Sequence, residues 1–290
     1  MLLVTDLDNT LYDWVTYFAR SFQAMLRELA QQLELPEERL GKEFKAVHQR
    51  YGNSEQPFAV LELPAVRERL PGRSRYELLQ ALEKPLAAFK EERKRSLRLY
   101  PGVSETLQSL DEAGITIVGH TEALAVSSYH RLRLLGVDHY FKHLYALDGE
   151  LLQHPDPERG EELNPPQGLV REVPRVERKP NPELLRDICA REGVDKSKCW
   201  YVGDSLTRDI SMAKQAGVQA VWARYGTEFP ARHWKTVVEV THWTEEDVER
   251  ERRLKQLFSQ VQPDFTIDSF AELKRLLALP SLPSTAAAAG

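Results

Sequence analysis

The sequence predicts an α/β protein, with a Rossmann-like core of parallel strands and a helical cap domain inserted into that core. Three observations predict this class. A short apolar segment at residues 1–5 ends abruptly at Asp6, as a strand buried on both faces does. Residues 15–98 then carry apolar side chains at helical spacing. From residue 101 onward, helical stretches alternate with short apolar runs, which is typical of a parallel sheet covered by helices.

Length, composition and charge exclude several classes of protein. A chain of 290 residues with 42% hydrophobic and 29% charged residues is expected to fold as one large or two modest globular domains. The net charge of -5 gives no electrostatic case for a nucleic-acid partner. No apolar run reaches the roughly 18 residues of a membrane span, so no membrane partner is expected. Cys189 and Cys199 fall in one short stretch, which argues against a disulfide framework and for a reducing, cytoplasmic location. The oligomeric state stays open.

The cap at residues 15–98 is predicted to contain three amphipathic helices. Apolar side chains recur every three or four residues along residues 18–33, 40–51 and 76–89. Pro36 and Gly52 end the first two helices, and the third runs into a charged segment.

Residues 1–14 and 99–280 are predicted to form the core, built from units of one helix followed by one strand. Glycines that stop the predicted helices separate most of these units. Helices are expected at residues 103–113, 124–135, 182–192, 209–216 and 270–277. Strands are expected at residues 115–119, 144–147, 199–202, 219–223 and 264–267.

Two segments do not fit this alternation. Residues 148–178 are too long for a simple connection and predict an excursion over a sheet edge. Residues 228–262 contain two tryptophans and an acidic-basic helix at residues 244–257. Residues 281–290 have nothing that could pack, and we expect a disordered tail there.

The predicted strands end in polar residues, at the edge of the sheet where open α/β proteins bind their ligands. Four of these residues are carboxylates: Asp6, Asp8, Asp204 and Asp209. Like charges this close raise one another's pKa unless a cation neutralises them. Their ligand atoms are all oxygen, so the expected ion is Mg²⁺. Lys179, just ahead of a predicted helix, can bring a positive charge to the same edge.

These residues resemble, in order, the four motifs of the haloacid dehalogenase superfamily, and specifically its phosphatase branch with a helical cap between the first two motifs. Asp6-Leu7-Asp8-Asn9-Thr10 is similar to the first motif, and Thr121 after an apolar strand is similar to the second. Lys179 before a proline is similar to the third, and Gly203-Asp204 with Asp209 to the fourth. The resemblance covers residues 1–14, 99–147 and 179–227, and it finds no counterpart for the two segments at residues 148–178 and 228–262.

The resemblance implies Mg²⁺-dependent hydrolysis of a small-molecule phosphate ester through an aspartyl-phosphate intermediate. Asp6 would be the nucleophile, and Asp8 would be the general acid and then the general base. Asp6, Asp204 and the main-chain carbonyl of Asp8 would hold Mg²⁺, with Asp209 acting behind them or through water.

The resemblance also implies a phosphate pocket. Thr10, Thr121 and backbone N–H groups near Asp8 and Glu122 would bind the phosphoryl oxygens, while Lys179 neutralises charge on the nucleophile. Glu122 departs from the family pattern, because its charge opposes a phosphate unless the side chain turns away. Thr121 and Asp209 could also cap the helices that follow them, which is compatible with their roles in the site, and Lys179 could instead be a solvated lysine.

Two other functions stay open at this point. A phosphosugar mutase would use the same pair of Asp6 and Asp8 and show little net release of phosphate. A non-catalytic binding or regulatory protein could retain the pocket, although intact motifs argue against it. A dehalogenase is disfavoured, because that reaction needs neither Asp8 nor a metal ion.

Overall fold

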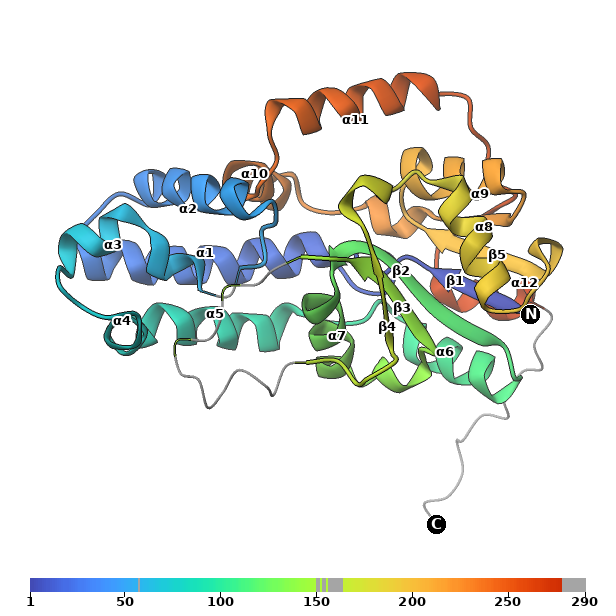
Figure 1. The fold of residues 1–290 in the computed structure, drawn as a ribbon, viewed down its shortest axis with the longest axis horizontal. Helices are drawn as coiled ribbons and strands as arrows, with labels where there is room; N and C mark the ends of the chain where they lie inside the picture. The colour runs from blue at the N-terminus through green and yellow to red at the C-terminus, as the bar shows by residue number, and fades with distance from the viewer. Residues whose placement is uncertain (57, 150–151, 153–154, 156–163, 278–290) are drawn as a thin grey trace, which may run out of the picture.

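The computed structural model describes residues 1–56, 58–149, 152, 155 and 164–277. Within these ranges it shows an α/β core with a parallel sheet and a helical insertion at one side, which confirms the predicted fold class (Figure 1). In Figure 1 the insertion lies at the left and the sheet at the right. None of the described helices is both long enough and apolar enough to cross a lipid bilayer.

The sheet that the described residues form has seven strands in the order β4-β3-β2-β1-β5-β6-β7, and all pairings are parallel. β1 lies at its centre, between β2 and β5. The first strand therefore ends in the middle of the sheet edge where such folds place their ligands. The strands are β1 (Leu2–Thr5), β2 (Thr116–Leu124), β3 (His143–Leu147), β4 (Val170–Val173), β5 (Cys199–Gly203), β6 (Gln219–Ala223) and β7 (Phe265–Ile267).

The side chains of β1 alternate between two hydrophobic cores, one on each face of the sheet. Leu3 belongs to the core that α6 (Val103–Glu112) and α7 (Ala125–Leu134) cover. Leu2 and Val4 belong to the core that α8 (Pro182–Arg191) and α9 (Ser211–Ala216) cover. Because both faces are covered, β1 has no polar side, and this explains the continuous apolar run in its sequence.

The insertion between β1 and β2 is helical, as predicted, but the third expected helix is divided. α1 (Trp14–Leu33) packs along α5 (Glu83–Ser96), and α2 (Glu37–Tyr51) follows α1. The helix expected at residues 76–89 is α4 (Arg75–Ala81) followed by α5. Leu82 interrupts it, and Pro85 lies in the first turn of α5, where a missing N–H breaks no helical hydrogen bond.

Two short elements of the insertion were not expected, η1 (Ala59–Glu62) and α3 (Pro64–Arg69). Their apolar side chains are fully buried in the core of the insertion, although the segment is too short to show a helical period. The domain boundaries at residues 15 and 98 stay a prediction.

Two core elements differ from their predicted limits. β2 continues to Leu124, past the expected end at residue 119, through an irregular pairing with β3 between His120 and Leu124. The helix expected at residues 209–216 is preceded by a π-helical turn, η6 (Leu206–Ile210), so that α9 begins only at Ser211. The last helix is a short pair, η8 (Phe270–Glu272) and α12 (Leu273–Leu276).

The segment at residues 148–178 contributes a strand. It contains β4, which extends the sheet beyond β3, and a short helix, η4 (Arg175–Glu177), follows β4. Residues 150–151, 153–154 and 156–163 of this segment lie outside the described residues, as does the predicted tail at residues 281–290.

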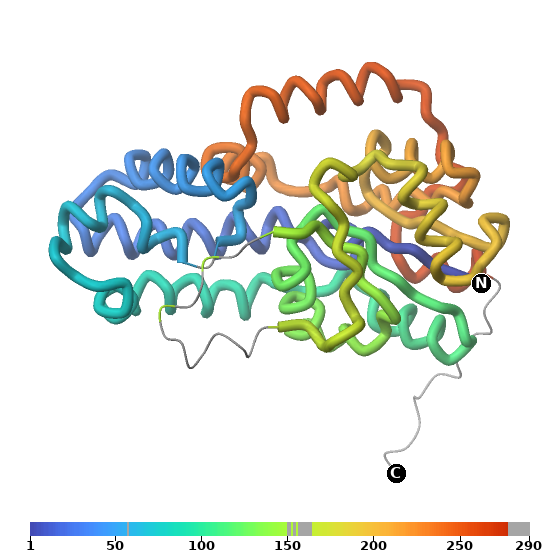
Figure 2. Tube along the Cα trace, in the orientation of Figure 1, coloured from blue at the N-terminus to red at the C-terminus, as the bar shows by residue number. Residues whose placement is uncertain are grey.

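The segment at residues 228–262 contributes two helices. α10 (Ala231–Val240) packs against α1 and α2 of the insertion. α11 (Glu245–Leu257), close to the helix expected at residues 244–257, then returns toward the core, as the chain trace at the top of Figure 2 shows. The segment therefore connects the insertion with the side of the molecule that carries β6 and β7.

Candidate active site

Asp6 follows β1 directly and is held there by its neighbours. Its N–H donates to the Val202 carbonyl of β5 at 2.9 Å. Its carboxylate accepts hydrogen bonds from Thr10 Oγ1 at 3.1 Å and from Lys179 Nζ at 2.6 Å. Burial raises the pKa of Asp6 to about 7, with Lys179 opposing this shift and Asp209 adding to it. A cation beside Asp6 would favour its ionised form, against the effect of burial.

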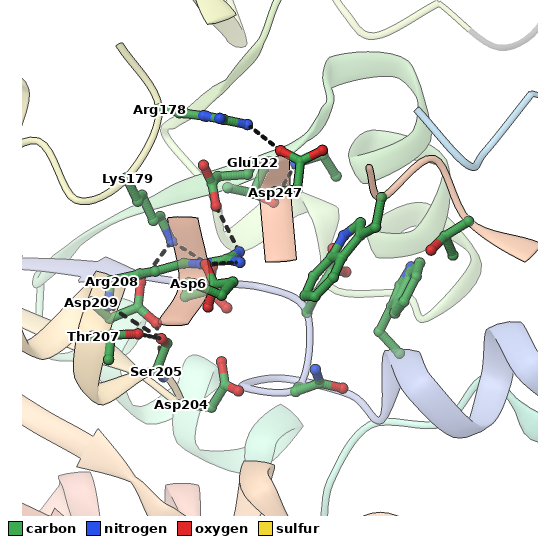
Figure 3. A pocket seen from close by; sticks show the side chains of 18 of the residues that line it. Asp6, Glu122, Arg178, Lys179, Asp204, Ser205, Thr207, Arg208, Asp209 and Asp247 are labelled. Atoms are coloured by element: carbon green, nitrogen blue, oxygen red, sulfur yellow. Dashed lines mark hydrogen bonds and ion pairs between the residues drawn. The ribbon is translucent and has the colours of Figure 1, made fainter. Parts of the chain in front are cut away.

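Lys179 bridges two carboxylates at the centre of the site (Figure 3). Its Nζ lies 2.6 Å from Asp6 Oδ1 and 2.9 Å from Asp209 Oδ1. Burial acts to lower the pKa of Lys179, but Asp209 and Asp6 outweigh it and hold that pKa well above its usual value. Asp209 is fixed in turn by the Tyr201 hydroxyl and the Ser205 N–H, each at 3.1 Å. Lys179 is thus a fixed positive charge beside Asp6.

Asp6, Asp204 and Asp209 form a cluster that fits one cation. Each offers a carboxylate oxygen, and these three oxygens lie within 4.8 Å of one another. Burial, together with Asp6 and Asp209, raises the pKa of Asp204 well above its usual value. An all-oxygen set of this kind suits Mg²⁺, whose charge favours the ionised carboxylates. Both oxygens of Asp209 and both oxygens of Asp6 already accept hydrogen bonds, so the division of the three carboxylates into direct and indirect ligands stays a prediction.

The carboxylate of Asp8 points to a different set of partners. Its Oδ1 accepts a hydrogen bond from the Tyr12 hydroxyl at 2.6 Å, and Arg131 Nη2 lies 3.1 Å from the same oxygen. Burial raises the pKa of Asp8, and Arg131 opposes the shift. The cluster found among the described residues does not include Asp8. Its predicted contact with the metal through the main-chain carbonyl stays a prediction.

Thr121 and Glu122 lie on β2 where it borders the same pocket. Thr121 Oγ1 accepts from the Ala123 N–H at 3.1 Å, and it does not cap a helix, because Leu124 is the N-cap of α7. Glu122 pairs with Arg208 Nη1 at 2.9 Å, as Figure 3 shows. This ion pair neutralises the charge that would otherwise oppose a bound phosphate.

A pocket of about 980 Å³ joins these side chains. The sheet edge contributes the carboxylates, and the helical insertion contributes residues 52–55. α11 and the residues around it line the opposite side, including Trp243 and Arg250. Arg250 also donates to the Lys179 carbonyl, and Arg208 Nε donates to Glu251 of α11 at 2.9 Å. The segment at residues 228–262 therefore borders the site directly, which its sequence did not predict.

Arg131 and Glu55, which form the ion-pair network beside Asp8, were not predicted from the sequence. Arg131 of α7 is 2% exposed and contacts both Asp8 and Glu55, which lies in the loop after α2. A signal for Arg131 was present in the sequence. The residue shares the buried face of α7 with Ser128 and Leu132, where the helical pattern favours an apolar side chain. An arginine on such a face needs buried acidic partners.

Two family models match the chain over most of its length. The model for haloacid dehalogenase-like hydrolases matches residues 3–164, and a model described as HAD-hydrolase-like matches residues 176–273. The chain belongs to the haloacid dehalogenase-like hydrolase family. This membership confirms the superfamily expected from the four motifs, and it makes the protein a hydrolase by family.

Two relatives of this haloacid dehalogenase-like hydrolase are phosphatases. The glyceraldehyde 3-phosphate phosphatase of Methanopyrus kandleri is 27% identical over 224 residues, which cover 76% of this chain and 82% of that protein. The phosphoglycolate phosphatase of Nitrosococcus oceani is 26% identical over 276 residues, 95% and 96% of the two chains. A solved 2-haloacid dehalogenase from Pseudomonas syringae pv. Tomato DC3000 matches with a TM-score of 0.56 at 22% identity, over 96% and 97% of the two chains. That last likeness concerns the fold alone.

Proposed function

We propose that this protein hydrolyses a small phosphomonoester in a Mg²⁺-dependent reaction that passes through a phosphorylated Asp6. One observation carries the proposal. The Asp6 carboxylate lies 2.6 Å from the buried Lys179, and it is close enough to the carboxylates of Asp204 and Asp209 for the three to bind one cation. An anionic nucleophile approaches an anionic phosphate only where positive charge neutralises both. Lys179 supplies one such charge. Mg²⁺ bound by Asp6 and Asp204 would polarise the phosphoryl oxygens.

The first step is attack on phosphorus by a carboxylate oxygen of Asp6. The bond from phosphorus to the leaving oxygen breaks, and Asp8, two residues further along the same loop, donates a proton to that oxygen. Thr10 holds the nucleophile through its 3.1 Å hydrogen bond, and its contact with the substrate stays a prediction. Thr121 borders the pocket and is available to bind a phosphoryl oxygen.

The second step releases inorganic phosphate. Asp8, now deprotonated, takes a proton from a water molecule, and the resulting hydroxide attacks the phosphorus of the aspartyl-phosphate. The bond between phosphorus and the Asp6 oxygen breaks, and the Asp6 carboxylate is regenerated. Asp209 holds Lys179 Nζ at 2.9 Å, beside the Asp6 carboxylate, so Lys179 would neutralise Asp6 in both steps.

The relatives support a small phosphomonoester as the substrate class. Their printed names include phosphoglycolate and glyceraldehyde 3-phosphate phosphatases. The fold shared with a 2-haloacid dehalogenase does not favour dehalogenation, because the carboxylate cluster and Asp8 would then have no role.

A panel of phosphomonoesters tests the proposal. Phosphoglycolate, glyceraldehyde 3-phosphate, hexose phosphates and p-nitrophenyl phosphate are incubated with the protein, and free phosphate is measured with Mg²⁺ and with EDTA. We expect release that EDTA stops and Mg²⁺ restores. A mutase would instead convert a hexose phosphate to its isomer with little net phosphate release.

The variant Asp6→Asn assigns the nucleophile. The amide keeps the shape of the side chain and loses the nucleophilic oxygen, so turnover should be abolished while the circular dichroism spectrum stays unchanged. Turnover of Asp6→Asn within about tenfold of the parent would contradict the assignment.

A further inference from the structure

Arg131 is a buried arginine whose guanidinium touches the carboxylate of Asp8. Its Nη2 lies 3.1 Å from Asp8 Oδ1, and its Nε donates to the Tyr12 hydroxyl at 2.9 Å. The Tyr12 hydroxyl donates in turn to the same Asp8 oxygen at 2.6 Å. Arg131 Nη2 also donates a hydrogen bond to Asp8 Oδ2 at 3.3 Å. Arg131 and Tyr12 therefore contact both oxygens of Asp8, and this fixes the direction in which the carboxyl group points.

The other end of the guanidinium is held by the helical insertion. Nη1 of Arg131 contacts both carboxylate oxygens of Glu55. Glu55 also accepts a hydrogen bond from Trp14 Nε1 at 3.1 Å, so two elements of the insertion meet at this carboxylate. A guanidinium is rigid and planar, and any movement of Glu55 that turns Arg131 also changes the contact with Asp8.

A role in packing alone does not explain Arg131. Burying a charge is costly, and an apolar side chain on this face of α7 would pack against the core without that cost. Both carboxylates that Arg131 holds border the active-site pocket, whereas Arg131 is not among the described residues that line it. Arg131 thus acts on the pocket through Asp8 and Glu55.

We propose that Arg131 is a positioning residue that ties the Asp8 carboxyl to the helical insertion through Glu55. Efficient proton donation to the leaving oxygen then requires Glu55 to be seated as it is in this structure. The inference rests on the proposed function, in which Asp8 donates that proton, and it adds a link between the insertion and the chemical step.

The leaving group provides a readout that a purely structural role would not move. An alkoxide is a poor leaving group and needs the proton from Asp8, and general acids of this kind contribute about 10²–10⁴-fold. p-Nitrophenolate leaves as a stable anion and needs little help. Loss of the correct Asp8 orientation should therefore slow hydrolysis of an alkyl phosphate far more than hydrolysis of p-nitrophenyl phosphate.

The test compares the parent, Arg131→Met and Glu55→Gln on p-nitrophenyl phosphate and on an alkyl phosphate, which is phosphoglycolate or, if another alkyl ester of the panel is hydrolysed faster by the parent, that ester in its place. Formation of the phosphorylated enzyme is followed in single turnovers, so that the hydrolysis step does not mask the first step. Arg131→Met should lose about 100-fold or more on phosphoglycolate and less than about tenfold on p-nitrophenyl phosphate, with KM changing by less than about threefold. Glu55→Gln should show the same preference, with a loss of about tenfold on phosphoglycolate.

Arg133→Met is the matched control, because it removes the same charge from the exposed side of the same helix. It should stay within about twofold of the parent on both substrates. Equal losses on the two substrates in Glu55→Gln would overturn the inference, and this holds even if Arg131→Met fails to fold. A parent that releases no phosphate from any phosphomonoester of the panel overturns the proposed function instead, so the two failures are distinguishable.

Discussion

Gly226 lies in the turn after β6, where that turn meets the loop after β1. A Cβ on this residue would lie 1.9 Å from the Asn9 carbonyl oxygen and 2.8 Å from Asp204 Cβ. Ordinary contacts begin at 3.4 Å, so Gly226→Ala requires a displacement of 3.4 − 1.9 = 1.5 Å on the Asn9 side. The obstacle is a backbone atom and cannot swing away. The loop that carries Asp8 must therefore move, or the turn that carries Gly226 must.

The expected effect of Gly226→Ala on catalysis is large. A misplacement of about 1 Å in a catalytic group costs about 100-fold in rate, and overpacking costs about 1–3 kcal/mol in the free energy of unfolding. We therefore expect kcat to fall by about 100-fold or more, and the melting temperature to fall by several degrees. The Tyr225 hydroxyl donates to the Thr10 carbonyl at 2.7 Å, so a shift of the turn also reaches Thr10.

Steady-state kinetics and thermal unfolding, measured on one preparation, test this prediction. Gly41→Ala is the matched control, because Gly41 lies inside α2 and its Cβ would meet only Val240 Cγ1, at an ordinary 3.8 Å. That variant should retain the parent's kcat and gain up to about 1 kcal/mol in stability, since alanine favours a helix. A Gly226→Ala protein with unchanged melting temperature and with kcat within about threefold of the parent would refute the reasoning.

Two further predictions concern charge. Lys179→Met leaves Asp6 and Asp209 without the cation that bridges them, so kcat should fall by about 10²–10³-fold. In urea titrations with EDTA present, the free energy of unfolding of the variant should be about 3–5 kcal/mol lower than that of the parent. His48 donates through Nδ1 to the Val240 carbonyl at 2.5 Å, and burial lowers its pKa from 6.5 to about 4, so the folded state keeps His48 neutral where the unfolded state protonates it. The contribution of neutral His48 to the free energy of unfolding is complete above pH 6.5 and is lost as the pH falls toward 4, by up to about 3 kcal/mol. In urea titrations over that pH range, His48→Gln should therefore lose less stability than the parent.

The sheet and its catalytic edge were predictable because their signals are local. The apolar run of β1 has no polar side, and Asp6 marks its end. Asp204 follows another buried strand, and Lys179 precedes a helix whose N-cap is Asn181. Parallel topology then brings these strand ends together without further information.

The remaining parts of the site depend on contacts between distant segments. β4 has only four residues, and its place beside β3 is set by pairing across the sheet. α11 has no buried residues, so its sequence carries no apolar face from which its position over the pocket could be inferred. The link from Arg131 to Glu55 spans 76 positions in the sequence. Pattern alone could mark Arg131 as unusual, but it could not name its partner.

The central position of β1 has a consequence for the folding of the protein during its synthesis on the ribosome. β1 is synthesised before both of its partners, which are β2, more than 110 residues later, and β5, which ends at Gly203. At about 5–20 residues per second, the chain from Asp6 to Asp204 takes about 10–40 seconds to make. Until residue 179 is made the nascent chain carries its nucleophile without Lys179, and until residue 204 is made it lacks Asp204. The edge of β1 that later pairs with β5 stays unpaired until β5 is made. We expect this edge to be the surface that a ribosome-associated chaperone protects, and expect no phosphatase activity from chains stalled before residue 199.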